Sequence, residues 1–227
     1  MTDVNYSIIV AIDGPSGSGK STVAKAVAAA AGMIYIDTGA MYRAVAFYNI
    51  MSGNDLNDED IITKSMKNIH IDIQFDETKT QRLILNNKDV TDALRTMEIA
   101  KSASIVAAYP GVRKELVALQ RELAGKYGVI MDGRDIGTFV LKDAHVKIYL
   151  TASIKERTRR RISELEKRGE KPDFNEIMEA IKARDYNDMN RTQSPLKQAE
   201  DAILIDSGGR SVSEITEMIL IEMAKVR

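Results

Sequence analysis

Residues 8–21 read IIVAIDGPSGSGKS, and this stretch decides the fold. An apolar run from Ile8 to Ile12 ends at Asp13 and leads directly into Gly14–Ser21, which fits the pattern G-x-x-x-x-G-K-[ST]. An alanine-rich, helix-forming segment follows at 21–31. In a strand–loop–helix of this kind, backbone N–H groups and the positive end of the helix surround a phosphate group. The stretch therefore predicts a nucleoside-triphosphate site, and we call Gly14–Ser21 the phosphate loop.

Four more short apolar runs also end directly before a polar residue. Continuous β-branched runs of this length are typical of strands buried on both faces of a parallel sheet. Helical segments alternate with these runs, which predicts a doubly wound α/β fold around a five-stranded parallel sheet. Ligands of such sheets gather at the carboxyl ends of the strands. The four runs are 33–36 before Asp37, 128–131 before Asp132, 146–150 before Thr151 and 202–205 before Asp206.

The composition excludes several classes of protein. The 227 residues are 44% hydrophobic and 29% charged, with no cysteine and a formal net charge of −1. A disulfide framework, a thiolate metal site and a cysteine nucleophile are therefore excluded, and a polybasic nucleic-acid binder is disfavoured. The longest apolar stretch, 26–36, is shorter than the roughly 20 residues that span a bilayer, and the N-terminus does not resemble a signal peptide. We expect a cytoplasmic protein with no membrane or nucleic-acid partner.

The interval between the second and third apolar runs is about ninety residues, far longer than the roughly 30 of a strand–helix–strand unit. Within it, apolar residues alternate with polar ones over 69–75, and a second run at 83–85 is closed by Asn86 and Asn87. This pattern predicts a small antiparallel sheet in an inserted subdomain. Elsewhere, capping-box patterns at 153–156 and 211–214 predict helix starts, and Gly125 and Gly169 predict helix ends.

The phosphate loop assigns roles to individual residues. Lys20 is expected to reach the β- and γ-phosphates, and the Ser21 hydroxyl to bind Mg²⁺. The basic run at 157–161 is a candidate lid over the triphosphate, although a solvated charged face is the more common explanation of such a run. The residues predicted to bind the nucleoside triphosphate are Gly14, Pro15, Ser16, Gly17, Ser18, Gly19, Lys20, Ser21, Thr22, Arg157 and Arg161.

Three further clusters lie where a second substrate is expected. The first, at 37–43, follows the second strand, and the alternative is a turn with an incidental arginine. The second, at 132–137, carries charges that are costly to bury unpaired, so it indicates a cleft wall, with structural ion pairing as the alternative. The third continues an apolar stripe after Pro172 into Arg184, Asp188 and Arg191, which share one helix face. Exposed ion pairs at the helix end are the alternative there. Arginine in these clusters suits a phosphate group.

The phosphate loop, the 37–43 segment, the segment 132–138 and the Arg184/Asp188/Arg191 helix, in this order, resemble bacterial-type cytidylate kinase. The resemblance covers nearly the whole chain and includes the long insertion. It implies a P-loop kinase core over 1–40, 115–155 and 172–227, an inserted monophosphate-binding subdomain over 41–114 and a short lid over 156–171. It also implies MgATP as donor and CMP or dCMP as acceptor, and we expect a monomer.

The resemblance carries roles to matching positions of this sequence. It implies that the acceptor phosphate is held by Arg43, Arg134 and Arg191. It also implies that Ser104, Arg113 and Asp135 read the cytosine with Thr38 nearby, and that Arg184 and Asp188 contact the sugar. Lys20, Arg134 and Arg191 are the expected catalytic residues, and Asp132 is expected beside the magnesium ligands. The implied acceptor residues are Thr38, Arg43, Ser104, Arg113, Arg134, Asp135, Arg184, Asp188 and Arg191.

Three other functions share part of this pattern. A P-loop kinase acting on another monophosphate or a small alcohol has the same loop and differs in its acceptor. A GTP-dependent switch needs an N-K-x-D motif, whereas Asn87, Lys88 and Asp89 lack the intervening residue. A nucleic-acid-binding ATPase needs stacking aromatics and a basic groove, and only 5% of the residues are aromatic.

Overall fold

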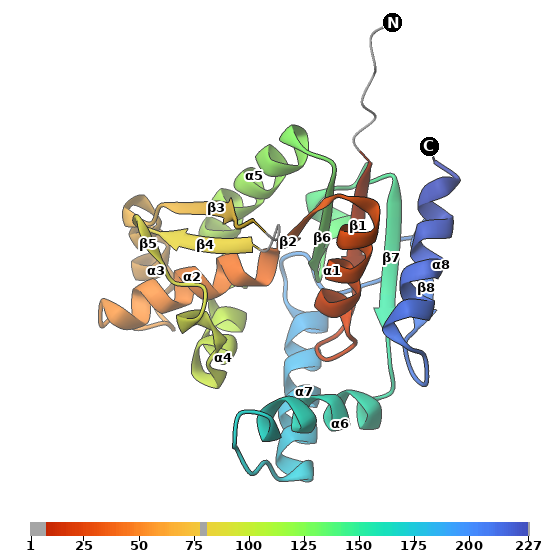
Figure 1. Cartoon of the computed structure of the whole chain (residues 1–227). Coiled ribbons are helices and arrows are strands. Elements are labelled where there is room, and N and C mark those ends of the chain that lie inside the picture. Colours follow the sequence, from red (N-terminus) through yellow and green to blue (C-terminus); the bar gives the residue numbers. More distant parts are fainter. Residues whose placement is uncertain (1–7, 78–80, 227) are drawn as a thin grey trace, which may run out of the picture. The chain divides into compact units, whose positions relative to one another are not determined.

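A computed structural model describes residues 8–77 and 81–226 of the chain (Figure 1). The chain divides into two compact units, of which the first comprises residues 1–33 and 128–227 and the second residues 34–127.

The first unit is built around parallel strands. These are β1 (Ile9–Asp13), β6 (Val129–Gly133), β7 (Val146–Thr151) and β8 (Ile203–Asp206). With β2 (Ile34–Asp37), they form the five-stranded order β2-β6-β1-β7-β8, which confirms the predicted parallel sheet. The register pairs Asp13 at the end of β1 with Gly133 at the end of β6, so the segments that follow both strands start at the same edge.

The last strand departs from the prediction that all five runs are buried on both faces. Val10, Ile12 and Ile130 in the middle strands are fully buried, whereas Ile203 and Leu204 of β8 are exposed. β8 stands at the edge of the sheet and pairs only with β7, so fewer elements cover it. Composition alone does not separate an edge strand from a central one.

Four helices and one π-helical turn accompany these strands in the described part of the first unit. They are α1 (Lys20–Ala31), α6 (Ile154–Glu166), α7 (Phe174–Asn190), α8 (Val212–Ala224) and the turn η3 (Ile136–Val140). α1 packs against α8, and Leu165, Ile177 and Ile181 join α6 to α7. Ser211 and Glu214 form the predicted capping box of α8, and the Ser153 side chain accepts from the Glu156 N–H at the start of α6.

The second unit combines helices with a small antiparallel sheet. Its core includes the buried side chains of Met41, Val45, Ile62, Leu83 and Leu94. Its elements are α2 (Thr38–Met51), α3 (Glu59–Ser65), η1 (Met66–Asn68), β3 (Ile71–Phe75), β4 (Gln81–Leu85), β5 (Lys88–Asp89), η2 (Ala93–Arg95), α4 (Met97–Val106) and α5 (Pro110–Lys126).

The predicted antiparallel sheet is confirmed: β3 pairs with β4, and β4 pairs with the additional short strand β5. Asn86 and Asn87, between β4 and β5, both have positive φ, as a two-residue hairpin turn requires. The helix end predicted near Gly125 falls at Lys126, the last residue of α5, but Gly125 itself lies inside the helix and does not have a positive φ. Gly169, three residues beyond α6, has positive φ and its N–H donates to the Glu166 carbonyl, as expected near a helix end.

None of the helices in the described part of the chain combines the length and apolar character needed to cross a bilayer.

Candidate active site

The phosphate loop leaves β1 at Asp13 and enters α1 at Lys20. Its three glycines, Gly14, Gly17 and Gly19, all have positive φ. A Cβ at Gly14 would collide with the carbonyl oxygen of Leu150, and Gly19, the N-cap of α1, has φ of 91°. The loop therefore adopts a glycine-dependent backbone that ends at the N-terminus of α1, which is the arrangement that the sequence predicts for an anion site.

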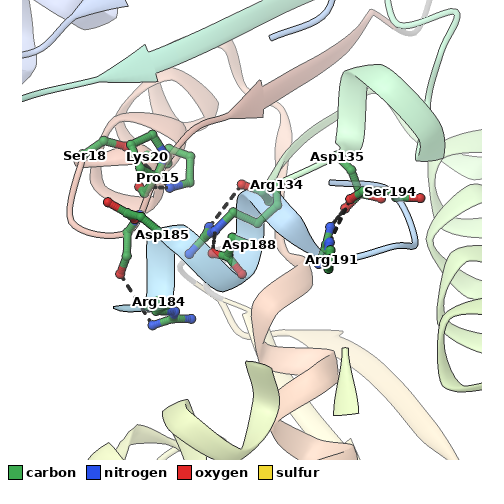
Figure 2. Close-up of polar contacts among 12 residues, drawn as sticks. Pro15, Ser18, Lys20, Arg134, Asp135, Arg184, Asp185, Asp188, Arg191 and Ser194 are labelled. Atoms are coloured by element: carbon green, nitrogen blue, oxygen red, sulfur yellow. Dashed lines mark hydrogen bonds and ion pairs between the residues drawn. The ribbon is translucent and has the colours of Figure 1, made fainter. Parts of the chain in front are cut away.

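Lys20 lies within this loop and is 5% exposed. Its Nζ donates to the Pro15 carbonyl oxygen at 2.7 Å and contacts the Ser18 hydroxyl oxygen at 3.5 Å (Figure 2). Burial lowers the pKa of Lys20 well below its usual value, and the positive charge of Arg134 lowers it further. The carboxylate of Asp132 opposes this shift. Because these surroundings disfavour the charged form of Lys20, a bound anion would stabilise its ammonium group.

Ser21 and Asp132 meet beside the phosphate loop. The Ser21 hydroxyl, in the first turn of α1, donates to Oδ2 of Asp132 in β6 at 2.8 Å. Hydroxyl and carboxylate oxygens are the donors that Mg²⁺ prefers, and Mg²⁺ in nucleotide sites takes few protein ligands besides the phosphates. This pair of side chains therefore fits the metal that the sequence predicts.

Two partly buried ion pairs join the segment after β6 to the C-terminal end of α7. Nε of Arg134 donates to Oδ2 of Asp188 at 2.7 Å, and Nη2 of Arg191 donates to Oδ1 of Asp135 at 3.0 Å (Figure 2). Burial alone would raise the pKa of Asp188, but the charges of Arg134 and Arg184 outweigh it and the pKa is lowered. Both aspartates and both arginines are residues that the sequence predicts for the acceptor.

Arg184 and Asp185, adjacent in α7, both approach Ser16 of the phosphate loop. Nη1 of Arg184 lies 3.5 Å from the Ser16 hydroxyl, and Asp185 accepts from the Ser16 N–H at 3.4 Å. Arg157 of α6 donates to Asp185 at 2.6 Å and to the carbonyl oxygens of Ser16 and Ala152 at 3.0 and 3.1 Å. Arg157, predicted to bind ATP, thus has protein partners in the phosphate loop, in α7 and in the segment just before α6.

The other arginines of α6 differ in what they contact. Arg160, which the sequence analysis did not select, donates to the Ser18 carbonyl and to the hydroxyl and carbonyl oxygens of Ser207. Arg161, which it did select for ATP, pairs with Glu164 of the same helix at 2.9 Å. The roles of Arg157 and Arg161 toward ATP stay predictions.

The remaining predicted acceptor residues belong to the second unit. Thr38 is the buried first residue of α2, and Arg43, one turn later, pairs with the N-cap residue Asp37 at 2.8 Å. Arg113 of α5 is 4% exposed and its Nη1 lies 3.4 Å from the hydroxyl of Tyr42. Ser104 is half-buried on α4, which packs against α2. The structure thus brings these four residues to the region around α2.

Sequence reasoning missed Asp13, Asp185, Arg160 and Ser207. Asp185 had a readable signal, because it lies four residues after Ile181 on the buried stripe of α7, where a carboxylate needs a cationic partner. Asp13 was visible as the polar end of a strand, but its partners, the N–H groups of Ile136 and Gly137, lie more than a hundred residues away. Arg160 lies in the basic run 157–161, which indicated its charge but not its partners, and no local pattern marks Ser207.

A parallel sheet with a phosphate loop after its first strand, arginines at the same edge and helices over it defines the P-loop kinase class. Solved structures agree on the fold. A gluconokinase from Sinorhizobium meliloti 1021 aligns with a TM-score of 0.51 at 15% identity, covering 97% of this chain and 93% of its own. A protein from Eubacterium ventriosum ATCC 27560, described as uncharacterized, aligns with a TM-score of 0.54 at 16% identity, covering 97% and 99%.

Sequence comparison narrows the class to a family. The family model described as "Cytidylate kinase" matches residues 10–225. A curated cytidylate kinase of Desulfitobacterium hafniense (strain Y51) is 47% identical over 211 residues, which cover 93% of this chain and 90% of the relative. A second, from Bacillus licheniformis, is 46% identical over 213 residues, which cover 94% of each. The chain belongs to the cytidylate kinase family.

Proposed function

We propose that this chain is a cytidylate kinase, an ATP-dependent nucleoside monophosphate kinase that moves the γ-phosphoryl group of MgATP to CMP or dCMP. The products are ADP and CDP or dCDP. One observation of the site supports the proposal beside the family membership: Nη1 of Arg184, predicted for the acceptor, lies 3.5 Å from the Ser16 hydroxyl of the phosphate loop, and burial together with the positive charges of Arg134 and Arg184 lowers the pKa of Lys20. Donor and acceptor cations therefore share one electrostatic site, which suits a reaction between two phosphate groups.

The reaction forms a bond between the γ-phosphorus of ATP and an oxygen of the CMP 5′-phosphate, and breaks the bond to the β–γ bridging oxygen. A phosphomonoester has its second pKa near 6, so the attacking oxygen is already anionic at neutral pH. The enzyme needs no general base for this step. Its contribution is in-line positioning and stabilisation of the charge on the migrating group.

The phosphate loop and Lys20 would bind the β- and γ-phosphates. Lys20 has a depressed pKa in the structure because it is buried beside Arg134, and bound phosphate charge would raise that pKa and hold the ammonium form. The Ser21 hydroxyl would hold Mg²⁺ while Asp132, 2.8 Å from it, orients the hydroxyl. When bound, the metal neutralises phosphate charge.

Arg134 and Arg191 would hold the acceptor phosphate with Arg43, and Asp188 and Asp135 would fix the orientation of the first two. Each of these ion pairs leaves guanidinium N–H groups for phosphate oxygens, because one arginine has five such donors. Arg184 and Asp188 would contact the sugar, and Ser104, Arg113 and Asp135 the cytosine, with Thr38 nearby. These roles rest on the family resemblance.

The movable parts are also proposals. The segment 156–171, which includes most of α6, would serve as the lid, and 41–114 as the monophosphate-binding subdomain. Lid closure would exclude water, which otherwise competes with CMP as the acceptor. A monomeric state and a cytoplasmic location stay predictions.

An acceptor panel tests the proposal. Purified protein is incubated with MgATP and CMP, dCMP, UMP, AMP or GMP, and ADP release is followed in a coupled assay. We expect kcat/KM for the cytidine monophosphates to exceed that for AMP and GMP by at least about a hundredfold, because a missing hydrogen-bond partner in a polar base site is strongly rejected. Equal turnover of AMP or GMP would instead support another P-loop kinase.

A further inference from the structure

Asp13 is a buried carboxylate for which the proposed mechanism has no use. It is the last residue of β1, directly before Gly14 of the phosphate loop, and it is 5% exposed. Its two oxygens accept from two consecutive backbone N–H groups. Oδ1 accepts from Ile136 N at 2.8 Å, and Oδ2 accepts from Gly137 N at 2.7 Å.

These two N–H groups open the turn η3 and have no cap from its own sequence. Asp135 occupies the N-cap position, but its side chain makes no capping hydrogen bond and pairs with Arg191 instead. Free N–H groups at the start of a helical turn need an acceptor, and a carboxylate is among the best. Asp13 supplies that acceptor from a different strand, so it caps η3 in place of Asp135.

The capped turn directly follows the residues predicted to recognise the acceptor. Arg134 and Asp135 lie between β6 and η3, and their side chains pair with Asp188 and Arg191. Asp13 thus fixes the backbone after Asp135, while α7 and its C-terminal end hold the two side chains. Because Asp13 is also contiguous with the phosphate loop, one side chain connects the donor loop to the acceptor segment.

Burying the Asp13 carboxylate costs folding free energy. Burial raises the pKa of Asp13 to about 6, against the opposing effect of the Gly137 and Ile136 N–H groups. A neutral residue would avoid the cost of burying a charge. An ionised carboxylate is nevertheless the side chain whose two oxygens can both accept, and so the one that can hold two adjacent N–H groups.

Resting on the proposed function, we propose that Asp13 is a positioning residue that holds Arg134 and Asp135 in register with the phosphate loop and thereby sets acceptor affinity and base discrimination. The substitution Asp13→Asn tests this with little change in volume. The asparagine amide presents one acceptor and one donor group, so its NH₂ faces an N–H where an acceptor is needed.

We expect Asp13→Asn to separate the two substrates. Calorimetric titration should show the Kd for CMP rising about tenfold or more, the effect of losing one charge-assisted hydrogen bond, while the Kd for ATP stays within about threefold. The ratio of kcat/KM for CMP to that for UMP should fall, because Asp135 is displaced. In amide NMR spectra, the Ile136 and Gly137 signals should lie downfield in the wild-type chain and shift upfield in the variant.

Asp206→Asn is the matched control. Asp206 also ends a strand of the parallel sheet and accepts a backbone N–H, that of Gly208, at 2.8 Å, but it is exposed. This variant should keep both Kd values and the CMP-to-UMP ratio within about twofold of the wild type. Asp13→Ser, which offers a single hydroxyl acceptor, is the second variant and should reproduce the loss of CMP affinity if Asp13→Asn does not fold.

The proposal fails if Asp13→Asn weakens ATP binding as much as CMP binding, or if the CMP-to-UMP ratio keeps its wild-type value. It also fails if the Ile136 and Gly137 signals do not move. Failure of the proposed function has a different signature, because then the wild-type chain itself neither binds nor phosphorylates CMP.

Discussion

The ion pair between Arg157 and Asp185 gives the sharpest prediction for stability. Their side chains are only 8% and 11% exposed, and Nη1 of Arg157 lies 2.6 Å from Oδ2 of Asp185. The substitution Asp185→Ala would leave the Arg157 guanidinium buried with two carbonyl partners, those of Ser16 and Ala152. Removing one partner of a buried pair costs about 3–5 kcal/mol, and the two remaining carbonyls favour the lower end, about 3 kcal/mol.

A loss of that size is measurable as a shift in the unfolding temperature. At about 2–4 °C per kcal/mol for a chain of this length, Asp185→Ala should lower Tm by roughly 6–12 °C in scanning calorimetry. Lys182→Ala is the matched control on the same helix, because its pair with Glu179 at 2.8 Å is exposed. That variant should change the free energy of unfolding by less than about 1 kcal/mol.

A double substitution makes the reasoning refutable. Replacing both partners, as in Arg157→Met with Asp185→Leu, removes the orphaned charge and should recover part of the stability lost in Asp185→Ala. If Asp185→Ala lowers Tm no more than Lys182→Ala, the pair does not stabilise the junction of α6, α7 and the phosphate loop. If the double variant is no more stable than Asp185→Ala, the orphaned-charge explanation is wrong.

Three further predictions concern the site. Asp135→Ala should reduce the CMP-to-UMP ratio of kcat/KM by about tenfold and leave the Kd for ATP nearly unchanged; a collapse of ATP affinity with intact base preference would contradict the role of Asp135. Ser21→Ala should raise the Mg²⁺ concentration needed for half-maximal rate by roughly 10–100-fold, measured by metal titration, because Asp132 loses the hydroxyl it orients. Because folding raises the pKa of Asp13 from 3.8 to about 6, its stabilising contribution is complete below pH 3.8 and lost as the pH rises through 6. The free energy of unfolding of the wild type minus that of Asp13→Asn, from denaturant melts, should therefore fall by about 3 kcal/mol between pH 3.5 and 7; a flat difference would contradict the buried, shifted carboxyl.

The strands and the phosphate loop were predictable because their signals are local. The β-branched run that ends at Asp13 predicts a strand, and the glycines and Lys20 that follow it predict the phosphate loop, without reference to distant residues. The hairpin at 71–85 was equally readable, since alternation over seven residues defines which side chains face the core. The exposure of β8 could not be predicted, because it depends on which strand stands at the edge of the sheet.

The candidate site was predictable where a residue lies on a periodic face or at a strand end. Arg184, Asp188 and Arg191 continue the apolar stripe of α7, and Asp132 is the second-last residue of β6. Partners across the fold were not predictable in this way: the contact of Arg160 with Ser207 and that of Asp13 with η3 join segments far apart in the chain. For Arg157, the run of basic residues predicted its charge and helix correctly but did not indicate that Asp185 would be its partner.

The most direct measurement follows the transferred group itself. The wild-type chain is incubated with CMP, Mg²⁺ and ATP radiolabelled in its γ-phosphate, and the products are separated by ion-exchange chromatography. The account predicts that the label appears in CDP, in amounts equal to the ADP formed, and that Arg134→Ala strongly reduces this transfer. Label found only in inorganic phosphate, with CMP recovered unchanged, would contradict it.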